Sequence, residues 1–486
     1  MTTIRNAVAA AALACAASAH AADDPPANTV PRALGLTPET ATVPARPEKP
    51  DFAAEIEARK SYWIPAAEIV GFDFLLNRFD KQYFGCCDFD VTARTVRRNL
   101  RSSWVVDRDP FMVNQLGHPY QGSMYHGFAR ASGLDFWEGL GYTFLGSAFW
   151  EIAGETTPPS RNDQVNTGIG GAFLGEALFR ISNLLLERGD YPKWLRETAA
   201  AAVSPPVGFN RLAFGDRFDR PFPSRAPAFF SRLQLGFSGT SGNDSGTSRT
   251  SLRRNEALAD FYLDYGMPGK RDYEYTRPFD YFSFQATASS ANGFENVMTR
   301  GLLKGRSYGE GADTYRGVYG LYGHYDYIAP QTFRVSSTAL SLGTTLEWRP
   351  RDFLVLQGTA AGGVGYAAAG SIRSVAENDF SYGLAPHALL SMRAIYGARL
   401  ALDVTARQYY VTRVAAASHG GNENIARVDA ALTWRVHDRH GISVKYLANR
   451  RDASYPDLPG VKQRRETIGL FYTLLGRDRF GAVDWR

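Results

Sequence analysis

The sequence is poor in cysteine, with three among 486 residues. Cys86 and Cys87 are neighbours, and an ordinary disulfide between them would be strained because adjacent Cα atoms lie only about 3.8 Å apart. The pair is therefore interpreted as two small apolar residues or free thiols, with a strained vicinal disulfide or a link to a partner as alternatives. A chain of this length does not need disulfides when its core is large.

The sequence also lacks the patterns of several functional classes. It contains no HExxH, GxSxG or CxxC motif, and its basic and acidic residues are interspersed rather than gathered into an arginine block. A net charge of +5 over 486 residues is mild, so nothing indicates nucleic-acid binding. No cofactor is predicted, and the sequence alone leaves a metal unknown.

The amino terminus does contain an export signal. Arg5 precedes an alanine-rich apolar run, and the tripeptide AHA at 19–21 forms a small-x-small cleavage site. The run is too short to span a bilayer, so residues 1–21 are predicted to be a secretory signal peptide. Cys15 resembles a lipoprotein cysteine, but Ala12 stands where such a motif has leucine, and the later cleavage site fits better.

Composition divides the mature chain into further segments. Residues 22–50 are proline-rich without an apolar period and are predicted to be a disordered linker. Residues 51–203 have helical patterning, whereas residues 227–486 have strand patterning. Residues 204–226, rich in proline, glycine and arginine, are predicted to be the linker between them. The predicted fold class is α+β in two parts, an N-terminal all-α helical domain followed by a C-terminal antiparallel β domain.

The strand signal is a regular alternation of apolar and polar residues. In ARLALDVTARQYY, Leu400, Leu402 and Val404 alternate with Asp403 and Thr405, so one set lies on each face of a strand. Such segments recur with turn residues between them, near 228–238, 250–265, 278–289, 296–306, 313–327, 332–348, 352–366, 380–395, 398–412, 424–436, 440–450 and 465–475.

One face of these segments suits a water-filled lumen and the other suits lipid. The polar face carries both charges, with Glu256, Asp260 and Asp264 early and Arg399, Arg407, Arg427 and Arg435 late. Aromatic residues gather toward strand ends, as in interfacial girdles: Trp348, Tyr366, Tyr409, Tyr410 and Trp434. With the signal peptide, this predicts a transmembrane β-barrel of about 12 strands in a Gram-negative outer membrane. The predicted partners are outer-membrane lipids and the barrel-assembly machinery, and a secreted all-β domain is the alternative.

The carboxyl terminus departs from the usual pattern of such barrels. They usually end on an aromatic residue, whereas this chain ends Asp-Trp-Arg with Trp485 penultimate. The last strand, or its recognition during assembly, is therefore left open.

The helical half contains the unusual stretch NQLGHPYQGSMYHGFAR at 114–130. Pro119 suits the first position of a helix, so His118 is predicted at or just before its cap. Residues four positions apart lie on the same side of a helix, so His126 and Arg130 are predicted on the side of His118. A second helix is predicted after SGLD at 132–135, a capping-box spacing. Its polar stripe recurs every four residues, at Thr143, Ser147, Glu151 and Glu155.

The third predicted helix, DQVNTGIGGAFLGEALFRISNLLL, follows the loop TTPPSRND. Gly171 and Gly175 form a GxxxG pair, which admits a very close helix neighbour. Asp163 lies in the first turn, where the helix dipole favours an anion. Glu176 and Arg180 are four residues apart and are predicted to pair.

Polar residues of the three helices are predicted to meet, because carboxylates on an apolar helix are costly to bury unpaired. The predicted cluster contains Asn114, His118, Ser123, His126, Arg130, Glu151, Glu155, Ser160, Asp163 and Asn166. Three interpretations stay open: a hydrogen-bonded network that fixes helix packing, a hydrolytic site with one of the histidines as general base, and a metal site. The candidate catalytic residues are His118, Ser123, His126, Glu151, Glu155 and Asp163.

The same residues carry a resemblance to a known family. Residues 100–215 resemble the bacterial domain of unknown function 3943 family, whose HPxxGSxY, WExxxE, PSxND and GGxxLGE elements occur here in order. These elements fall on His118, Pro119, Gly122, Ser123, Tyr125, Trp150, Glu151, Glu155, Ser160, Asn162, Asp163, Gly170, Gly171, Gly175 and Glu176. The acidic residue, loop, Asp and glycine-rich helix are also similar, more weakly, to VanZ-like membrane proteins. The first resemblance implies an envelope location and supplies no reaction.

The charges on the three helices make them poor hydrocarbon segments, so the helical domain is predicted on the periplasmic side, packed against or into the barrel mouth. The leading hypothesis is an outer-membrane barrel with a periplasmic helical plug or docking domain, serving envelope structure or the passage of a lipid or solute. The alternatives are a hydrolase of envelope lipid or glycan that uses His118, Glu151 and Asp163, and a passive scaffold or adhesin.

Overall fold

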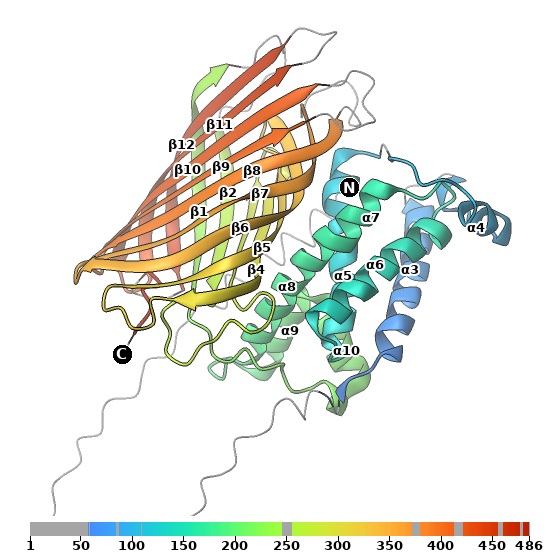
Figure 1. Ribbon diagram of the computed structural model, residues 1–486, viewed down its shortest axis with the longest axis horizontal. Coiled ribbons are helices and arrows are strands. Elements are labelled where there is room, and N and C mark those ends of the chain that lie inside the picture. Colours follow the sequence, from blue (N-terminus) through green and yellow to red (C-terminus); the bar gives the residue numbers. More distant parts are fainter. Residues whose placement is uncertain are drawn as a thin grey trace, which may run out of the picture.

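The computed structural model describes residues 57, 59–83, 87–107, 109–244, 255–371, 380–412, 421–454, 460–476 and 480–485. Within them, a group of helices precedes a closed β-barrel, and the two parts lie side by side (Figure 1). The predicted fold class is therefore confirmed. The predicted signal peptide (1–21), the proline-rich linker (22–50), Cys86 and the side chain of Cys87 lie outside the described residues.

The helical part consists of α-helices with π-helical turns ahead of two of them. Its elements are α3 (Trp63–Tyr83), η1 (Cys87–Phe89), α4 (Ala93–Asn99), η2 (Val113–Gly117), α5 (His118–Ala131), α6 (Phe136–Ala153), α7 (Arg161–Val165), η3 (Asn166–Gly170), α8 (Gly171–Leu186), α9 (Lys193–Val203), α10 (Pro205–Phe214) and η4 (Gly215–Arg217). The elements α7, η3 and α8 follow one another without a break, so Arg161–Leu186 is one helix of 26 residues. This helix is long and apolar enough to cross a membrane, and most of it is buried.

The barrel consists of antiparallel strands in chain order, closed by pairing of the first with the last, so that Leu235 pairs with Tyr472. Its strands are β1 (Phe229–Asp244), β2 (Asn255–Tyr265), β3 (Phe282–Ser289), β4 (Gly293–Tyr308), β5 (Tyr315–Ile328), β6 (Phe333–Arg351), β7 (Leu354–Ser371), β8 (Phe380–Tyr396), β9 (Leu400–Val411), β10 (Asn422–His437), β11 (His440–Ser454) and β12 (Val461–Leu475). Each of the predicted segments became one strand, because the alternation that identifies a strand is local.

The lumen is polar and the exterior of the barrel is apolar. Successive residues of a strand point alternately inward and outward, and outward side chains such as Phe237 (72%), Leu342 (71%) and Leu470 (62%) are exposed. Inward charged side chains are buried and paired: Arg465 with Glu256, Lys445 with Asp260, Arg407 with Asp326, and Arg427 with Glu295. The predicted lumenal position is thus confirmed for Glu256, Asp260, Arg407 and Arg427. It is wrong for Arg399, which is exposed in the turn before β9.

The two ends of the barrel differ in their connections. The two-residue turns 352–353 and 438–439 lie at the end where the helical part joins β1; we call it the turn end, and the 16-residue connection 266–281 lies there as well. The two ten-residue connections, 245–254 and 412–421, leave the opposite end, which we call the loop end. Outer-membrane barrels place short turns on the periplasmic side and longer loops outside.

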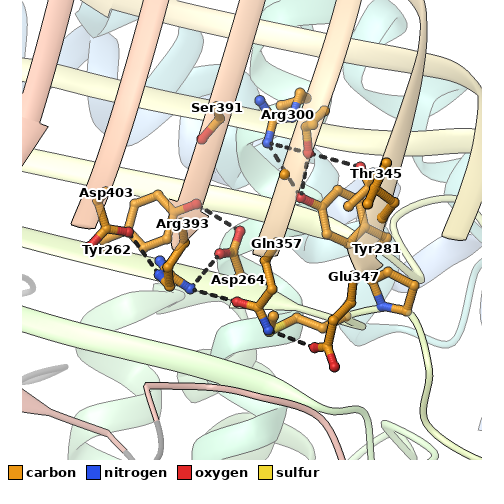
Figure 2. A pocket seen from close by; sticks show the side chains of 15 residues that line it. Tyr262, Asp264, Tyr281, Arg300, Thr345, Glu347, Gln357, Ser391, Arg393 and Asp403 are labelled. Carbon is orange, nitrogen blue, oxygen red and sulfur yellow. Dashed lines mark hydrogen bonds and ion pairs between the residues drawn. The ribbon is translucent and has the colours of Figure 1, made fainter. Parts of the chain in front are cut away.

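Ion pairs cross the lumen between strands that are not neighbours. Arg393 on β8 pairs across the lumen with Asp264 on β2 (3.4 Å), and it also pairs with Asp403 on the adjacent strand β9 (2.7 Å), as Figure 2 shows. Arg232 on β1 also reaches Asp403 (2.5 Å). Two adjoining cavities beside these groups are about 30 Å³ each, which is room for roughly two water molecules. Side chains therefore fill this level of the lumen.

The carboxyl-terminal segment 480–485 folds back into the turn end of the barrel. Phe480 is 1% exposed among apolar lumenal residues. The Val483 amide donates to the Glu347 carboxylate (3.1 Å), which belongs to the lumenal face of β6. Trp485 packs against a neighbouring arginine rather than ending a strand. This resolves the open question about the terminus: β12 is the last strand, and Trp485 belongs to a tail that follows it.

The helical part lies against the outside of the barrel. Asp326 of β5 faces the lumen, where it pairs with Arg407 (3.1 Å), so its neighbour Tyr325 points outward. The Tyr325 hydroxyl donates to the backbone carbonyl of Gln115 in η2 (2.6 Å). Figure 1 shows α8 alongside the barrel wall. The prediction of a helical plug is therefore wrong, because the docking surface is the outer wall rather than a mouth.

The predicted start of α6 after Asp135 is confirmed, whereas the start of the preceding helix and the residues of the capping box differ. The helix predicted to begin around Pro119 starts earlier, because the π-helical turn Val113–Gly117 leads directly into α5. The capping box of α6 is formed by Asp135 and Glu138, which accept from each other's backbone amides (2.8 Å each). The predicted box had placed Asp135 at the far position rather than at the cap.

The predicted linker 204–226 contains the helix α10, which begins with proline in its first turn, where the missing N–H is tolerated. Residues 218–228 remain without helix or strand before β1. The sequence indicated a linker because proline, glycine and arginine dominate the whole segment.

The predicted aromatic girdles hold at only some positions. Trp348 (45%) and Trp434 (56%) are exposed on the outer face. Tyr409 instead points inward, and its hydroxyl donates to Asp326 (2.7 Å). Tyr366 points outward but stacks on Tyr382 (5.3 Å between ring centres) beneath the helical part. The girdle prediction is wrong for Tyr409, whose side chain faces the lumen, and for Tyr366, which the helical part covers.

Candidate functional site

The predicted polar cluster separates into two groups along α5. His118 and His126 are eight residues apart, which corresponds to about 12 Å along a helix axis. His118 faces α6 and α7, whereas His126 faces α8. We call these the His118 group and the Glu176 group.

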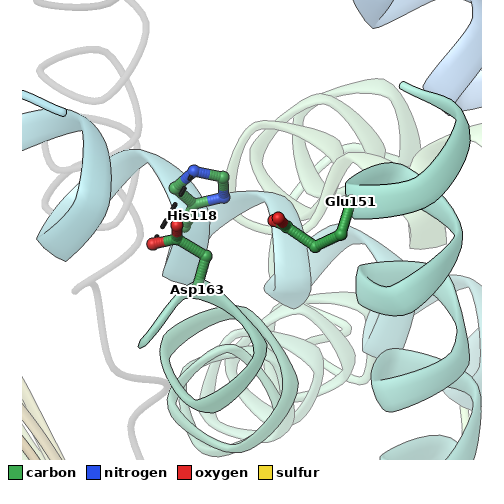
Figure 3. A group of neighbouring side chains, drawn as sticks. All are labelled: His118, Glu151 and Asp163. Atoms are coloured by element: carbon green, nitrogen blue, oxygen red, sulfur yellow. Dashed lines mark ion pairs between the residues drawn. The ribbon is translucent and has the colours of Figure 1, made fainter. Parts of the chain in front are cut away.

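The His118 group consists of His118, Glu151 and Asp163 (Figure 3). One potential ligand atom from each residue lies within 4.8 Å of the others, and His118 Nε2 is 3.9 Å from Asp163 Oδ1. The three residues are 7%, 3% and 2% exposed. His118 Nδ1 is buried without a hydrogen-bond partner among the residues that the structure describes.

The loop before α7 holds the two carboxylates in place. The Ser160 amide donates to Glu151 Oε2 (2.7 Å), and the Ser160 hydroxyl accepts from the Asp163 amide (3.2 Å) as the N-cap of α7. Asn162 donates to Asp163 Oδ1 (3.0 Å) and to the hydroxyl of Tyr382 on β8 (2.8 Å). The site therefore rests on the barrel wall as well as on the helices.

Further carboxyl groups from the neighbouring loops surround the His118 group. Burial raises the pKa of Glu155 to about 7. Burial, together with the nearby Asp107 carboxylate, raises the pKa of Asp109. The raised pKa values mean that these carboxyl groups hold protons more readily in the metal-free protein. A bound cation would take the place of those protons and favour the ionised carboxylates.

The Glu176 group ties the helices to one another and to the barrel. The Glu176 carboxylate accepts from Arg130 Nε (2.7 Å) and Arg180 Nε (2.8 Å), and His126 Nε2 lies 3.1 Å away. Arg180 also pairs with Asp280 (3.2 Å), in the segment between β2 and β3. The predicted Glu176–Arg180 pair is confirmed. Since its charges are matched, this group suits a structural role.

Three predicted catalytic residues lie apart from the His118 group. Ser123 donates to the Tyr120 carbonyl (2.6 Å) one turn back, and His126 belongs to the Glu176 group. Glu155 accepts from the Trp150 indole (2.8 Å) beside the group. The structure therefore brings together His118, Glu151 and Asp163 from the predicted catalytic set.

Sequence reasoning missed the barrel's contribution to the site. Tyr382 contacts Asn162 across 220 positions of sequence, and no local pattern signals such a contact. Asp107, whose carboxylate accepts from Asn114 (3.1 Å), was also missed. The acidic DRDP segment before the helix was the available signal for it.

The ligand set suits a divalent metal better than a serine nucleophile. One imidazole and two carboxylates are donors that Zn²⁺ and Mn²⁺ accept. The nearest hydroxyl, that of Ser160, donates to Asn162 Oδ1 (2.8 Å) and is thereby engaged. A metal bound by His118, Glu151 and Asp163 would provide Lewis-acid chemistry there.

The chain matches one described family over part of its length. Residues 103–206 match the family described as Domain of unknown function (DUF3943). The match spans α5, α6, α7 and α8, which hold His118, Glu151, Asp163 and Glu176, and it confirms the resemblance for this part of the chain. It supplies no activity, and the weaker likeness to VanZ-like proteins stays a prediction. No curated protein matches the chain.

Several solved outer-membrane proteins are distantly similar. The NanC porin is 11% identical, with a TM-score of 0.26, and the similarity covers 49% of this chain and 98% of that one. The KdgM porin is 7% identical (TM-score 0.23; 50% and 98% covered). The outer membrane channel DcaP of Acinetobacter baumannii is 9% identical (TM-score 0.25; 51% and 96% covered). Similarities of this size carry no argument about function, and the barrel architecture rests on its own strand pairing.

Proposed function

We propose that this protein is an integral outer-membrane protein whose barrel anchors the helical part in the envelope rather than conducting solutes. The observation that carries the proposal is the combination of an exposed apolar exterior with a lumen crossed by ion pairs. An apolar band around a closed barrel fits lipid, and the predicted signal peptide fits export.

The lumenal ion pairs argue against an open pathway. Arg393 pairs with Asp264 and Arg232 pairs with Asp403 across the lumen, and all four side chains are largely buried. Separating a buried ion pair leaves uncompensated charges and costs about 3–5 kcal/mol. Passage of a solute at this level would require several such separations, since the remaining cavities are about 30 Å³ each.

The anchoring role is tested by conductance. We expect the mature chain, folded as judged by heat-modifiable migration, to give no steady current in planar bilayers. Deleting residues 57–217 is expected to leave that background unchanged, because the helices lie outside the lumen. Steady conductance of the full chain would overturn the anchoring role, and a mature chain that dissolves without detergent would overturn the outer-membrane placement.

A second candidate function is divalent-metal binding by His118, Glu151 and Asp163, as the centre of a hydrolase of envelope lipid or glycan. The convergence of three buried ligands around an imidazole nitrogen without a partner in the described residues supports it. The excess of carboxyl groups in the surrounding loops supports it as well, since these favour a cation.

Metal binding is tested by equilibrium dialysis of the detergent-solubilised protein against Zn²⁺ and Mn²⁺. We expect one ion per chain and an affinity at least roughly tenfold lower for His118→Ala and Glu151→Gln. The exposed histidine variant His437→Ala is the matched control and is expected to bind as wild type. Equal binding by all variants, with unchanged helical circular dichroism, would leave only the hydrogen-bonded network interpretation.

A further inference from the structure

The polarity of α3 is the reverse of that of a helix on the surface of a water-soluble protein. Its buried side chains include Asp73 (2%) and Asn77 (5%), whereas Val70 (51%), Phe74 (61%) and Leu75 (66%) are exposed. A surface helix in water turns its apolar stripe inward and its polar residues outward. Both buried polar side chains form hydrogen bonds inside the helical part.

Helix α6, all of whose residues are described, shows the same reversal. Its exposed residues are all uncharged: Trp137, Gly141, Phe144, Leu145 and Phe149. Its buried residues include Ser147 (1%) and Glu151 (3%). Two neighbouring helices thus present a joint apolar surface on the side away from their polar clusters.

This apolar surface is joined to the barrel by the helix Arg161–Leu186, in which Gly168 contacts Phe144 of α6. Phe173 of α8 packs on Gly323 of β5, and Gly323 pairs in register with Leu340 of β6. Leu340 points outward and is 46% exposed, so α8 runs beside residues assigned to lipid contact. The apolar surface of the barrel therefore continues onto the helical part.

The helical part also extends along the height of the barrel. The helix Arg161–Leu186 has 26 residues, or about 39 Å at 1.5 Å per residue. An outer-membrane barrel has an apolar band of only about 25 Å. The helix contacts Tyr382 near the loop end through Asn162 (2.8 Å) and Asp280 near the turn end through Arg180 (3.2 Å).

We propose that the helical part is embedded in the outer membrane beside the barrel, with α3 and α6 in contact with lipid acyl chains. This inference rests on the proposed outer-membrane placement of the barrel. The charges on α3 and α6 lie inside or near the helix ends: Glu151 of α6 is 3% exposed and Glu138 lies in its first turn. The exposed Arg78 and Lys81 of α3 lie in its last two turns. A periplasmic domain would instead leave Phe74 and Leu145 in water.

The ends of the embedded part fit the two membrane surfaces. Exposed Arg94 and Arg97 of α4 lie at the loop end, where Asn99 donates to the Glu155 carbonyl (3.0 Å), and basic side chains there would meet anionic head groups. Tyr382 supports the His118 group. On β8 it is the outward-facing residue one step closer to the loop end than Leu384, which is 52% exposed. The His118 group therefore lies at the loop-end edge of the apolar surface, within reach of lipid head groups.

Site-directed spin labelling in phospholipid bilayers tests the embedding. In a chain with Cys86→Ser and Cys87→Ser, labels are placed at Phe74→Cys and Leu145→Cys. Leu432→Cys, on the outer face of β10, is the control for lipid, and Glu310→Cys, in the exposed turn before β5, is the control for water. We expect the Phe74 and Leu145 labels to match Leu432, colliding several-fold more with oxygen than with a water-soluble nickel chelate, and Glu310 to show the reverse.

The outcomes separate this inference from the placement of the barrel. Nickel access at Phe74 and Leu145, with Leu432 in lipid, would overturn the embedding and leave the outer-membrane proposal standing. Nickel access at Leu432 would overturn the outer-membrane proposal itself. Labels shielded from both reagents and coupled to a second label would show that another copy covers this face, which also overturns lipid contact. The two positions are on different helices, so one variant that fails to insert leaves the other to decide.

Discussion

Glu176 is the shared carboxylate partner of two arginines and a histidine in the helical part. It is 0% exposed and accepts from Arg130 and Arg180 at 2.7 and 2.8 Å. Replacing Glu176 with Gln keeps its shape but leaves buried positive charge without its counter-charge, which costs about 3–5 kcal/mol. We expect the free energy of unfolding to fall by that amount, as measured by urea titration of the helical circular dichroism signal in micelles.

The matched control is Glu197, which pairs with Arg211 (3.2 Å) and Lys193 (3.8 Å) while its side chain is 40% exposed. Surface pairs contribute less than about 1 kcal/mol, so Glu197→Gln is expected to change the unfolding free energy by no more than this. Similar small losses for both variants would contradict the structural role assigned to the Glu176 group.

At the residue scale, sequence reasoning reached contacts set by spacing along one helix and missed those set by tertiary packing. The Glu176–Arg180 pair follows from a separation of four residues and was predicted. The partners of His126 depend on how α5 and α8 are rotated against each other, and Tyr382 comes from a distant strand. One predicted cluster therefore became two groups, because residues on one helix face can still meet different neighbours.

Among the helices, the close crossing of α5 and α8 depends on glycine. A Cβ on Gly171 would lie 2.6 Å from the Gly122 Cα, which is backbone and cannot move aside cheaply. We expect Gly171→Ala to destabilise the helical part by about 2–3 kcal/mol, measured by the same titration. Gly141→Ala on α6, with nothing within 4 Å, is the control and is expected to be neutral or stabilising by up to about 1 kcal/mol. Equal changes for Gly171→Ala and Gly141→Ala would show that the predicted close approach of α5 and α8 does not contribute to stability.

The contact between α8 and β5 is the next element-scale test. A Cβ on Gly323 would lie 2.6 Å from the Phe173 ring, so Gly323→Leu is expected to push the helices off the wall while the barrel still folds. With a protease site introduced at Arg220, the cleaved helical fragment should elute separately from the variant barrel and together with the wild-type barrel in detergent. Gly362→Leu, at an exposed outward position on β7, is the control. Co-elution from the Gly323→Leu barrel would contradict docking through this contact.

Elements were predictable to the extent that their signal is local. The alternation of strands such as β9 and β10 is visible in a dozen residues, so the strands were found. The first helix began earlier than predicted, and the capping box of α6 used other residues. Both the π-helical turn before His118 and the cap at Asp135 depend on geometry that composition does not encode. Docking on the wall was not predictable, because an outward-facing tyrosine such as Tyr325 gives the same sequence pattern whether lipid or a helix covers it.

At the scale of the whole molecule, the barrel and the helices share one arrangement. Both keep charge inside, across the lumen in one case and between helices in the other, and both expose apolar side chains such as Leu470 (62%) and Leu145 (70%). A count of charged residues predicted a periplasmic helical domain, because such a count ignores the side of the helix on which each charge lies. Exposure on the folded molecule, rather than composition, therefore leads to the proposed bilayer placement.

Because of that arrangement, the change in unfolding free energy on adding one surface charge shows whether lipid or water surrounds the site. In lipid, Leu145→Lys would expose a charge to hydrocarbon, which costs about 2–4 kcal/mol near the midplane of a barrel's apolar band. In water, the same exposed substitution would change stability by no more than about 0.5 kcal/mol. We expect the larger loss in bilayers, measured by urea titration, together with a comparable loss for Leu432→Lys on the barrel and none for Glu310→Lys in the turn. A neutral Leu145→Lys beside a costly Leu432→Lys would place the helical surface in water, and the apolar face of α6 would then require a protein partner.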